Sequence, residues 1–226
     1  LRERLLAAQK PLVIAGGPLW SAESARALQR FAESWQLPVA CGFRFQDTFD
    51  NRHPQYAGDV GIGINPKLLQ RIKSADLLIV AGARLSEMTT QGYTLLDVPR
   101  PKQKLVHIHA DANELGKVYQ ADLAINATLP EFCAALKVLN PVKITWQAWR
   151  EQARADCLEN AKLTDIPGTL QMAQVVDFLR KRLPANSIIT NGAGNFSSWA
   201  HRFYPYRGFR TQLAPTNGSM GYGFPA

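Results

Sequence analysis

The chain has 226 residues, of which 46% are hydrophobic and 19% charged, a composition that can build a buried core and excludes a disordered chain. The formal charge of +8 would suit a nucleic-acid binder, but the basic residues are dispersed, and their tightest cluster, Arg180-Lys181-Arg182, falls near a predicted helix end, where cations complement the helix dipole. We therefore expect no nucleic-acid partner, and no membrane partner either, because no apolar run approaches the ~20 residues that a membrane span needs.

The cysteines and the first residues bear on where the protein works. Cys41, Cys133 and Cys157 are far apart and form no C-x-x-C pair, a pattern typical of a reducing, cytoplasmic setting without structural zinc. The sequence begins with L-R-E-R, which is no signal peptide, and it has no initiator methionine. We therefore expect a piece excised from a longer cytoplasmic protein.

Residues 1–140 alternate between strand and helix patterns. Short apolar runs that stop at glycine or polar residues are typical of buried parallel strands. They predict strands over residues 11–15, 38–41, 76–81, 104–108 and 122–125. Helices are predicted after the cap residue Ser21, from Pro66 to Ser74 after the cap residue Asn65, and from Pro130 to Leu139. Strands separated by crossover helices imply an α/β fold with a doubly wound, Rossmann-like parallel sheet covered on both faces.

The rest of the chain divides by composition. Residues 42–64 are rich in glycine, asparagine, aspartate and aromatic residues, and we interpret them as long functional loops. Asn140-Pro141-Val142 indicates a boundary, so we expect a middle domain over 1–140, a linker with a helix over 141–168 and the truncated start of a second α/β domain over 169–226. In these last parts, helices are predicted over 146–163 and 171–182, and a strand over 187–190.

Two glycine-rich motifs could carry chemistry. Residues 191–195, N-G-A-G-N, follow the last predicted strand and open a helix, so backbone N–H groups and the helix dipole could receive a phosphate. The alternative is a tight turn without a ligand. Residues 218–223 hold three glycines within six positions. That composition suits a loop whose backbone comes close to a ligand, or else a flexible tail.

Together the two motifs resemble one enzyme family. The stretch G-S-M-G-Y-G-F-P-A, from Gly218 to Ala226, resembles the G-x-M-G-x-G-x-P-A of acetolactate synthase and its relatives, where it follows a segment similar to N-G-A-G-N-F-S-S-W. Four further stretches come in that family's order and spacing: K-P-L-V-I-A-G-G, H-P-Q-Y-A-G-D-V-G, A-D-L-L-I-V-A-G-A-R-L and K-L-V-H-I-H-A-D. Over nearly its whole length, the chain thus resembles the middle domain and the first part of the cofactor-binding domain of these thiamine-diphosphate-dependent enzymes.

The resemblance implies an enzyme, a lyase or transferase that makes or breaks carbon–carbon bonds of 2-oxo acids. Its implied cofactors are thiamine diphosphate and Mg²⁺, and its implied full-length state is a homodimer or homotetramer. Ala193, Gly194, Asn195 and Phe196 match the residues that hold the diphosphate end of the cofactor. Which 2-oxo acid the enzyme takes cannot be read from these residues.

The second motif matches the part of the family's site that shapes the cofactor. Gly218 matches the residue whose carbonyl accepts a hydrogen bond from the aminopyrimidine, and Ser219 follows it in the cofactor-binding stretch. Met220 matches the bulky residue that props the cofactor into its bent, reactive shape, which would make Gly218 and Met220 catalytic. From the residue type alone, Met220 could instead be a core methionine.

Two requirements of the family have no match in this sequence. No Gly-Asp-Gly, the segment that begins the family's magnesium site, occurs in the chain. We expect the metal ligands to follow Ala226 and the activating glutamate to precede Leu1. This chain by itself should then be inactive, with no metal site of its own and no tight binding of thiamine diphosphate.

A second ligand site is implied less completely. In some family members the middle domain binds FAD or an adenine nucleotide, and Gly16, Gly17, Gly82, Ala83 and Arg84 stand where such contacts occur. The flavin-binding members tend to have two acids and an arginine where this chain has S-E-M, and an acidic residue where it has a histidine after the next strand. Arg84 could equally form an ion pair, so the site is either a bound nucleotide's or the relic of one.

Other interpretations remain open. The chain could be a nucleotide-binding module of an NAD- or FAD-dependent oxidoreductase or a regulatory protein, although G-G-P-L-W-S is no G-x-G-x-x-G and no acid ends the second strand at 39–41. An interaction scaffold would leave residues 218–223 unexplained. His107 and His109, with Glu114, could do acid–base work, but their alternating context favours one face at the end of a strand.

Overall fold

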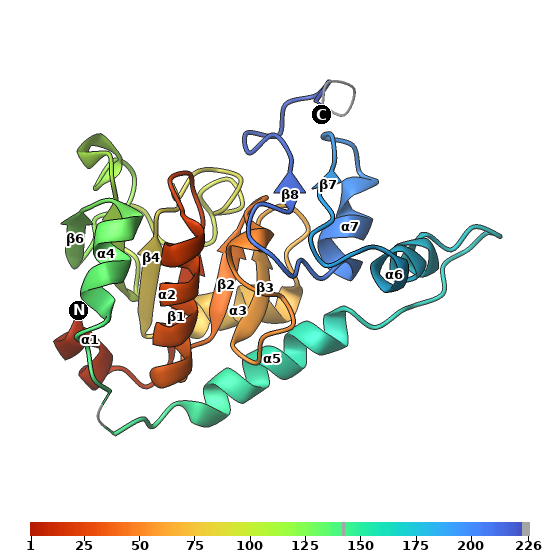
Figure 1. Cartoon of the computed structure of the whole chain (residues 1–226). Coiled ribbons are helices and arrows are strands. Elements are labelled where there is room, and N and C mark those ends of the chain that lie inside the picture. Colours follow the sequence, from red (N-terminus) through yellow and green to blue (C-terminus); the bar gives the residue numbers. More distant parts are fainter. Residues whose placement is uncertain (142, 223–226) are drawn as a thin grey trace.

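The computed structural model of the protein describes residues 1–141 and 143–222. Its larger part is a six-stranded sheet in which all neighbouring strands are parallel (Figure 1). The strands are β1 (Pro11–Ala15), β2 (Val39–Gly42), β3 (Tyr56–Val60), β4 (Leu77–Ala81), β5 (Lys104–His109) and β6 (Leu123–Asn126). The helices around them are α1 (Arg2–Ala7), α2 (Ala22–Ser34), α3 (Pro66–Ser74), α4 (Leu129–Leu136) and α5 (Gln147–Asn160). The predicted α/β fold with a doubly wound parallel sheet is confirmed.

The strand order of the sheet is β3-β2-β1-β4-β5-β6. The chain leaves β1 towards one edge and returns to β4 on the other side of β1. This is the order of a doubly wound nucleotide-binding fold, in which ligands bind where the strand order reverses, beyond the carboxyl ends of the strands. In this chain that place lies between the loops that follow β1 and β4.

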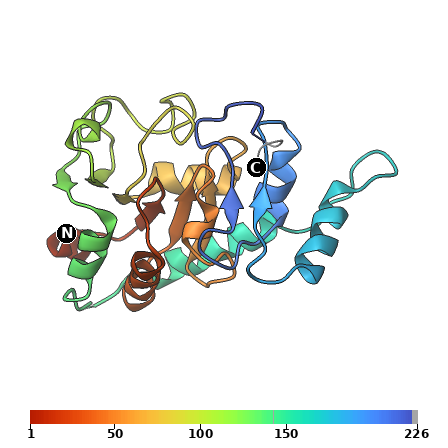
Figure 2. The ribbon, with the colours of Figure 1, turned by 45° about the horizontal axis from the view of Figure 1, so that its top comes forward.

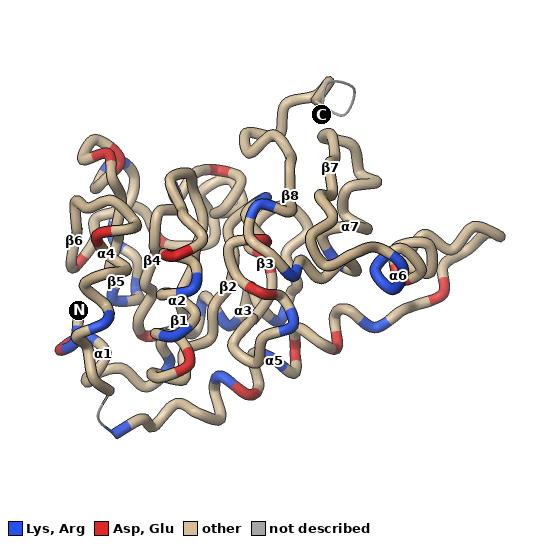
Figure 3. The backbone as a smooth tube through the Cα atoms, viewed as in Figure 1, with Lys and Arg blue, Asp and Glu red and all other residues tan. Residues whose placement is uncertain are grey.

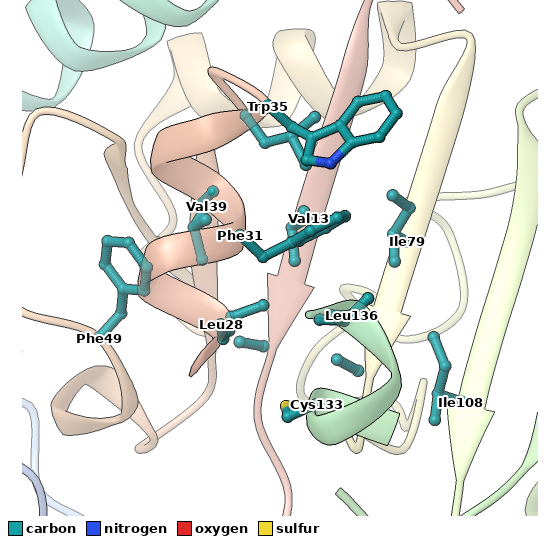
Figure 4. Close-up of a cluster of buried hydrophobic side chains, with 14 of the residues drawn as sticks. Val13, Leu28, Phe31, Trp35, Val39, Phe49, Ile79, Ile108, Cys133 and Leu136 are labelled. Atoms are coloured by element: carbon teal, nitrogen blue, oxygen red, sulfur yellow. The ribbon is translucent and has the colours of Figure 1, made fainter. Parts of the chain in front are cut away.

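Apolar side chains cover both faces of the sheet. Successive residues of a strand point to opposite faces, and β1 is buried along its whole length. On one face Val13 packs beneath α2 and α4, beside Phe31 and Trp35 (Figure 4). On the other face Ile14 belongs to a cluster with Ile72 of α3 and with residues of α5. Helices on both sides therefore close the core.

Side-chain caps explain where two helices begin. The Ser21 hydroxyl accepts a hydrogen bond from the Ser24 N–H at 3.0 Å, and the Asn65 side chain accepts one from the Lys67 N–H at 3.0 Å. Such caps satisfy N–H groups that have no partner within the helix. The helix over 66–74 has its predicted bounds, whereas α4 ends at Leu136, three residues before the predicted end.

One prediction for residues 42–64 is wrong. Tyr56–Val60 form β3, an edge strand that pairs with β2, and the loops are limited to the parts before and after it, with one short 3-10 turn over Gln46–Thr48. The stretch Y-A-G-D-V has little local strand propensity because it contains glycine and aspartate. Pairing with β2 and packing against α5, which buries Ala57 and Val60, stabilise the strand instead.

Helix α5 lies across the face of the sheet that also carries α3. The indole N–H groups of Trp146 and Trp149 donate to the carbonyls of Trp35 and Pro11, each at 2.9 Å. Arg71 of α3 pairs with Asp156 of α5, and both side chains are buried. These bonds satisfy polar groups that burial would otherwise leave without partners, and they attach α5 firmly to the sheet.

The last part of the chain forms a smaller unit beside the sheet. Its elements are α6 (Met172–Arg182), β7 (Ile189–Thr190), α7 (Ser197–Phe203) and β8 (Gln212–Leu213). The strands β7 and β8 pair in parallel and lie side by side in Figure 2. This unit has a core of its own, made of Ala173, Val176, Phe203, Tyr204 and Tyr206.

Lysine and arginine are spread over both parts of the molecule (Figure 3). The basic cluster predicted near a helix end lies at the end of α6, where Arg180 and Lys181 both pair with Asp177, at 2.5 and 2.6 Å. Across residues 1–141 and 143–222, no helix combines the length and apolar character of a membrane span.

Candidate functional site

The two glycine-rich motifs lie at the same edge of the β7–β8 pair. β7 runs into residues 191–196, and β8 runs into residues 214–222. The N–H of Asn191 donates to the carbonyl of Leu213 at 3.1 Å, which joins the first residues beyond the strands. Because β7 and β8 are parallel, both segments leave the pair in the same direction, as Figure 1 shows. The fold therefore brings together two motifs that are separate in the sequence.

The first segment offers backbone donors. Within the described residues, the N–H groups of Ala193, Gly194, Asn195 and Phe196 find no hydrogen-bond acceptor. These four residues are partly or largely exposed. A Cβ on Gly194 would lie 2.7 Å from the ring of Phe196, which is 58% exposed. A run of free N–H groups on small residues suits an anion such as a diphosphate.

The helix that follows contributes less than its position predicts. α7 has seven residues, and the N–H groups of Ser197, Ser198 and Trp199 already donate to carbonyls of the preceding loop, at 3.0 to 3.1 Å. The donors left for an anion are therefore those of the loop rather than those of the helix terminus.

The second segment presents an apolar side chain to solvent. Met220 is 90% exposed, so it belongs to no apolar core among the described residues. Gly218 and Gly221 have φ angles of 77° and 91°, in the left-handed region that favours glycine. Ser219 is exposed beside them. Of the motif's last residues, Gly223, Phe224, Pro225 and Ala226 lie outside the described part of the chain.

The loop after β2 holds both segments in place, and sequence reasoning did not single out its residues. Arg44 is buried and donates to the carbonyls of Gly192 and Pro215, at 3.0 and 2.5 Å. Asp47 accepts from the N–H groups of Thr211 and Gln212, at 2.9 and 3.1 Å. The only indication in the sequence was the loop-like, functional composition of residues 42–64.

Two comparisons with known proteins bear on this arrangement. The family model described as "Thiamine pyrophosphate enzyme, central domain" matches residues 1–136, more than half of the chain. The chain belongs to this family.

Individual proteins similar to this chain match it over nearly its whole length. The chain is 28% identical to the large subunit of acetolactate synthase isozyme 2 from Escherichia coli (strain K12), over 100% of this chain and 40% of that protein. It is 26% identical to sulfoacetaldehyde acetyltransferase from Alcaligenes xylosoxydans xylosoxydans, over 99% and 42%. It is 30% identical to the acetolactate synthase large subunit of Parasynechococcus marenigrum (strain WH8102), over 97% and 36%. The chain spans about two fifths of the length of these relatives.

The residues considered for a nucleotide lie where the strand order reverses. Gly16 and Gly17 follow β1, and Gly82, Ala83 and Arg84 follow β4. The glycines let the two loops touch: a Cβ on Gly17 would lie 1.9 Å from the Gly82 carbonyl oxygen, and one on Gly82 would lie 2.6 Å from that of Gly16. Loop packing alone therefore accounts for both glycines.

An open cavity of about 450 Å³ adjoins these loops. Ala83 and Arg84 line it, together with Thr216 and Asn217 of the segment 214–222. The Arg84 side chain is 57% exposed and pairs with Glu114 at 3.1 Å, as the ion-pair interpretation predicts.

His107 and His109 lie on one face of β5, as predicted, and both are buried. Their rings are 6.1 Å apart, and the His107 Nε2 atom lies 3.0 Å from the carbonyl oxygen of Ala83. Burial lowers the pKa of His107, so the ring is neutral at pH 7. Its hydrogen bond to a loop carbonyl supports a structural role.

A smaller cavity of about 220 Å³ lies where β3 and α5 meet the last part of the chain. Asp59, Cys157 and His201 are among its lining residues. Burial raises the pKa of Asp59 to about 7 and that of Cys157 to about 11. Burial, with the nearby charge of Arg44 as a second cause, lowers the pKa of His201 to about 4. At neutral pH the thiol and the imidazole are therefore uncharged.

Proposed function

We propose that this chain is part of an enzyme that uses thiamine diphosphate and Mg²⁺ to make or break carbon–carbon bonds of 2-oxo acids, as a lyase or transferase. The observation that carries the proposal is that the segments 191–196 and 214–222 leave the parallel β7–β8 pair at the same edge. The family membership and the full-length similarity to acetolactate synthase large subunits support it. The substrate is a small 2-oxo acid, and the complete protein is a cytoplasmic homodimer or homotetramer.

In this proposal the chain's own residues hold and shape the cofactor. The N–H groups of Ala193, Gly194, Asn195 and Phe196 donate to the diphosphate, which their lack of other acceptors allows. When bound, thiamine diphosphate supplies the carbanion stabilisation that 2-oxo acid chemistry requires. The protein's task is to orient it and to exclude water.

The second segment acts on the other end of the cofactor. The carbonyl of Gly218 accepts a hydrogen bond, the neighbouring Ser219 contacts the cofactor, and Met220 supports the bent shape with its apolar side chain. The 90% exposure of Met220 supports this role, because a supporting side chain has to project into the binding space rather than into the core.

We also propose a division of the chain into domains. Residues 1–140 form the middle domain, 141–168 the linker with its helix, and 169–226 the first part of the cofactor-binding domain. The separate apolar cluster of Ala173, Val176, Phe203, Tyr204 and Tyr206 supports the last unit, whereas the linker helix packs Trp146 and Ala153 into the clusters of the sheet. Because the sequence contains no Gly-Asp-Gly, we propose that this chain alone is inactive and that the magnesium ligands lie elsewhere in the complete protein.

Thermal unfolding of the complete protein tests the proposal. A ligand that binds only the folded state raises the melting temperature. We expect thiamine diphosphate with Mg²⁺ to raise it and to support decarboxylation of pyruvate or a related 2-oxo acid, with NAD having no effect. A shift with NAD alone, or no shift with thiamine diphosphate and Mg²⁺ at millimolar concentration, would overturn the proposal.

A second candidate ligand is FAD or an adenine nucleotide at the point where the strand order reverses. The cavity of about 450 Å³ beside Ala83 and Arg84 favours it. An FAD titration in the same experiment tests this second site. A bound flavin would raise the melting temperature, and its fluorescence would be quenched in the site.

A further inference from the structure

Arg44 lies at an unusual place for an arginine. It follows the end of β2 by two residues, has a φ angle of 60°, in the left-handed region, and is only 5% exposed. A side chain with a Cβ is strained in that backbone conformation. Glycine would remove the strain, so the position is held by something the arginine side chain does.

The guanidinium of Arg44 joins two distant segments. One terminal nitrogen donates to the carbonyl of Pro215 at 2.5 Å and the other to the carbonyl of Gly192 at 3.0 Å. Gly192 immediately precedes Ala193, and Pro215 lies in the turn closed by the N–H of Gly218 at 3.0 Å. One planar group therefore fixes the separation of the two glycine-rich segments.

The charge of this guanidinium is not neutralised within the described residues. Both of its bonds go to carbonyls, no carboxylate pairs with it, and its Nε atom is buried without a partner. Burial lowers the pKa of Arg44, although the group stays protonated at neutral pH. A buried positive charge beside segment 193–196 favours an anion there.

We propose that Arg44 is a positioning residue for cofactor binding, which sets the spacing of the segments 191–196 and 214–222 through the Gly192 and Pro215 carbonyls. The inference rests on the proposed function, because these segments are the proposed cofactor site. Arginine is required for the spacing, because the single ammonium of lysine lacks the fork that reaches two carbonyls at once.

Hydrogen exchange on the cofactor-free protein tests the spacing. The reporters are the N–H groups of Asn191 and Gly218, which donate to the carbonyls of Leu213 and Pro215. In Arg44→Lys and in Arg44→Met we expect both to exchange about ten- to a hundredfold faster, the range that corresponds to one charge-assisted hydrogen bond. The amides of β1 and β4 should exchange as in the wild type, which shows that the sheet is folded.

Calorimetric titration of the complete protein with thiamine diphosphate and Mg²⁺ tests the function. We expect the Kd to rise about tenfold or more in Arg44→Lys, which keeps the charge, and further in Arg44→Met, which loses it. Turnover at saturating cofactor should return towards the wild-type value in Arg44→Lys. The control is Arg52→Lys, in the same loop, because the Arg52 side chain is exposed and, among the described residues, pairs with Asp50 alone.

The outcomes separate the two proposals. If the wild type does not bind thiamine diphosphate, the proposed function fails, while the exchange rates still decide whether Arg44 spaces the segments. If Asn191 and Gly218 exchange at wild-type rates in both variants, or if the Kd is unchanged, Arg44 does not position the site.

Discussion

Met220 directs a large apolar side chain into solvent, with 90% of its surface exposed. In the complete enzyme, we expect Met220→Ala to lower turnover about a hundredfold, because misplacement of a reacting group by ~1 Å has that effect. The free energy of unfolding without cofactor should change by less than ~0.5 kcal/mol, as for other surface substitutions. Leu12→Ala, in the core, should instead cost ~2–5 kcal/mol. Turnover near the wild-type value in Met220→Ala would remove Met220 from the site.

Asp59 has an unusual pKa. Burial at the edge of a cavity raises it from 3.8 to about 7. The folded state therefore holds the proton more tightly than the unfolded state. The stability that this group contributes is fully present below about pH 4 and is lost as the pH rises towards 7.

The pH dependence of Asp59→Asn tests this assignment. We expect the variant to gain stability relative to the wild type between about pH 4 and 7, with a constant difference above about pH 8. Urea unfolding at several pH values measures the difference, with Asp97→Asn as an exposed control. A difference that does not vary with pH would show that the pKa of Asp59 is ordinary.

At the scale of elements, the loops after β1 and β4 depend on glycine for their contact. Gly17 and Gly116 have nearly the same φ, 77° and 78°, but a Cβ would clash only at Gly17, where it would lie 1.9 Å from the Gly82 carbonyl oxygen. Alanine costs ~1–2 kcal/mol at either position because of the left-handed backbone. We expect Gly17→Ala to cost a further ~1–3 kcal/mol from overpacking. Equal urea-unfolding free energies for the two variants would show that the loops separate without cost.

At the scale of the whole molecule, the last part of the chain is attached to the sheet through the loop after β2. Asn51 is buried and exchanges two hydrogen bonds with the backbone of Tyr206, each at 2.9 Å. Its amide also donates to the carbonyls of Gln46 and Phe49, at 2.8 and 2.7 Å. These bonds couple the loop after β2 to the unit that carries the two glycine-rich segments.

Removal of that side chain should uncouple the two parts. Asn51→Ala leaves the Tyr206 N–H without its acceptor in a buried place, at a cost of ~1–3 kcal/mol. In scanning calorimetry we expect the unit with β7 and β8 to unfold at a lower temperature than the sheet. Asn113→Ala, at an exposed turn, is the matched control. A single transition at the wild-type temperature would mean that other contacts hold the two parts together.

The elements whose causes are local could be predicted from the amino-acid sequence. Apolar runs predicted five of the six strands of the sheet, and the cap at Asn65 with Pro66 predicted the bounds of α3. The motifs around Gly194 and Gly218 pointed to the family, because the spacing of unusual residues can be recognised without knowledge of the fold. Capping, periodicity and motif spacing each depend on residues that are neighbours in the chain.

Which distant groups meet depends on the folded chain and could not be predicted from local patterns. Tyr56–Val60 become β3 because β2 offers an edge and α5 covers it, although the segment's own residues do not favour a strand. Arg44 acquires its role from carbonyls 148 and 171 residues away. Met220 is 90% exposed, which its residue type alone does not predict. Such facts depend on which backbone groups lack partners after the sheet has formed, and that is a property of the folded chain rather than of any local pattern.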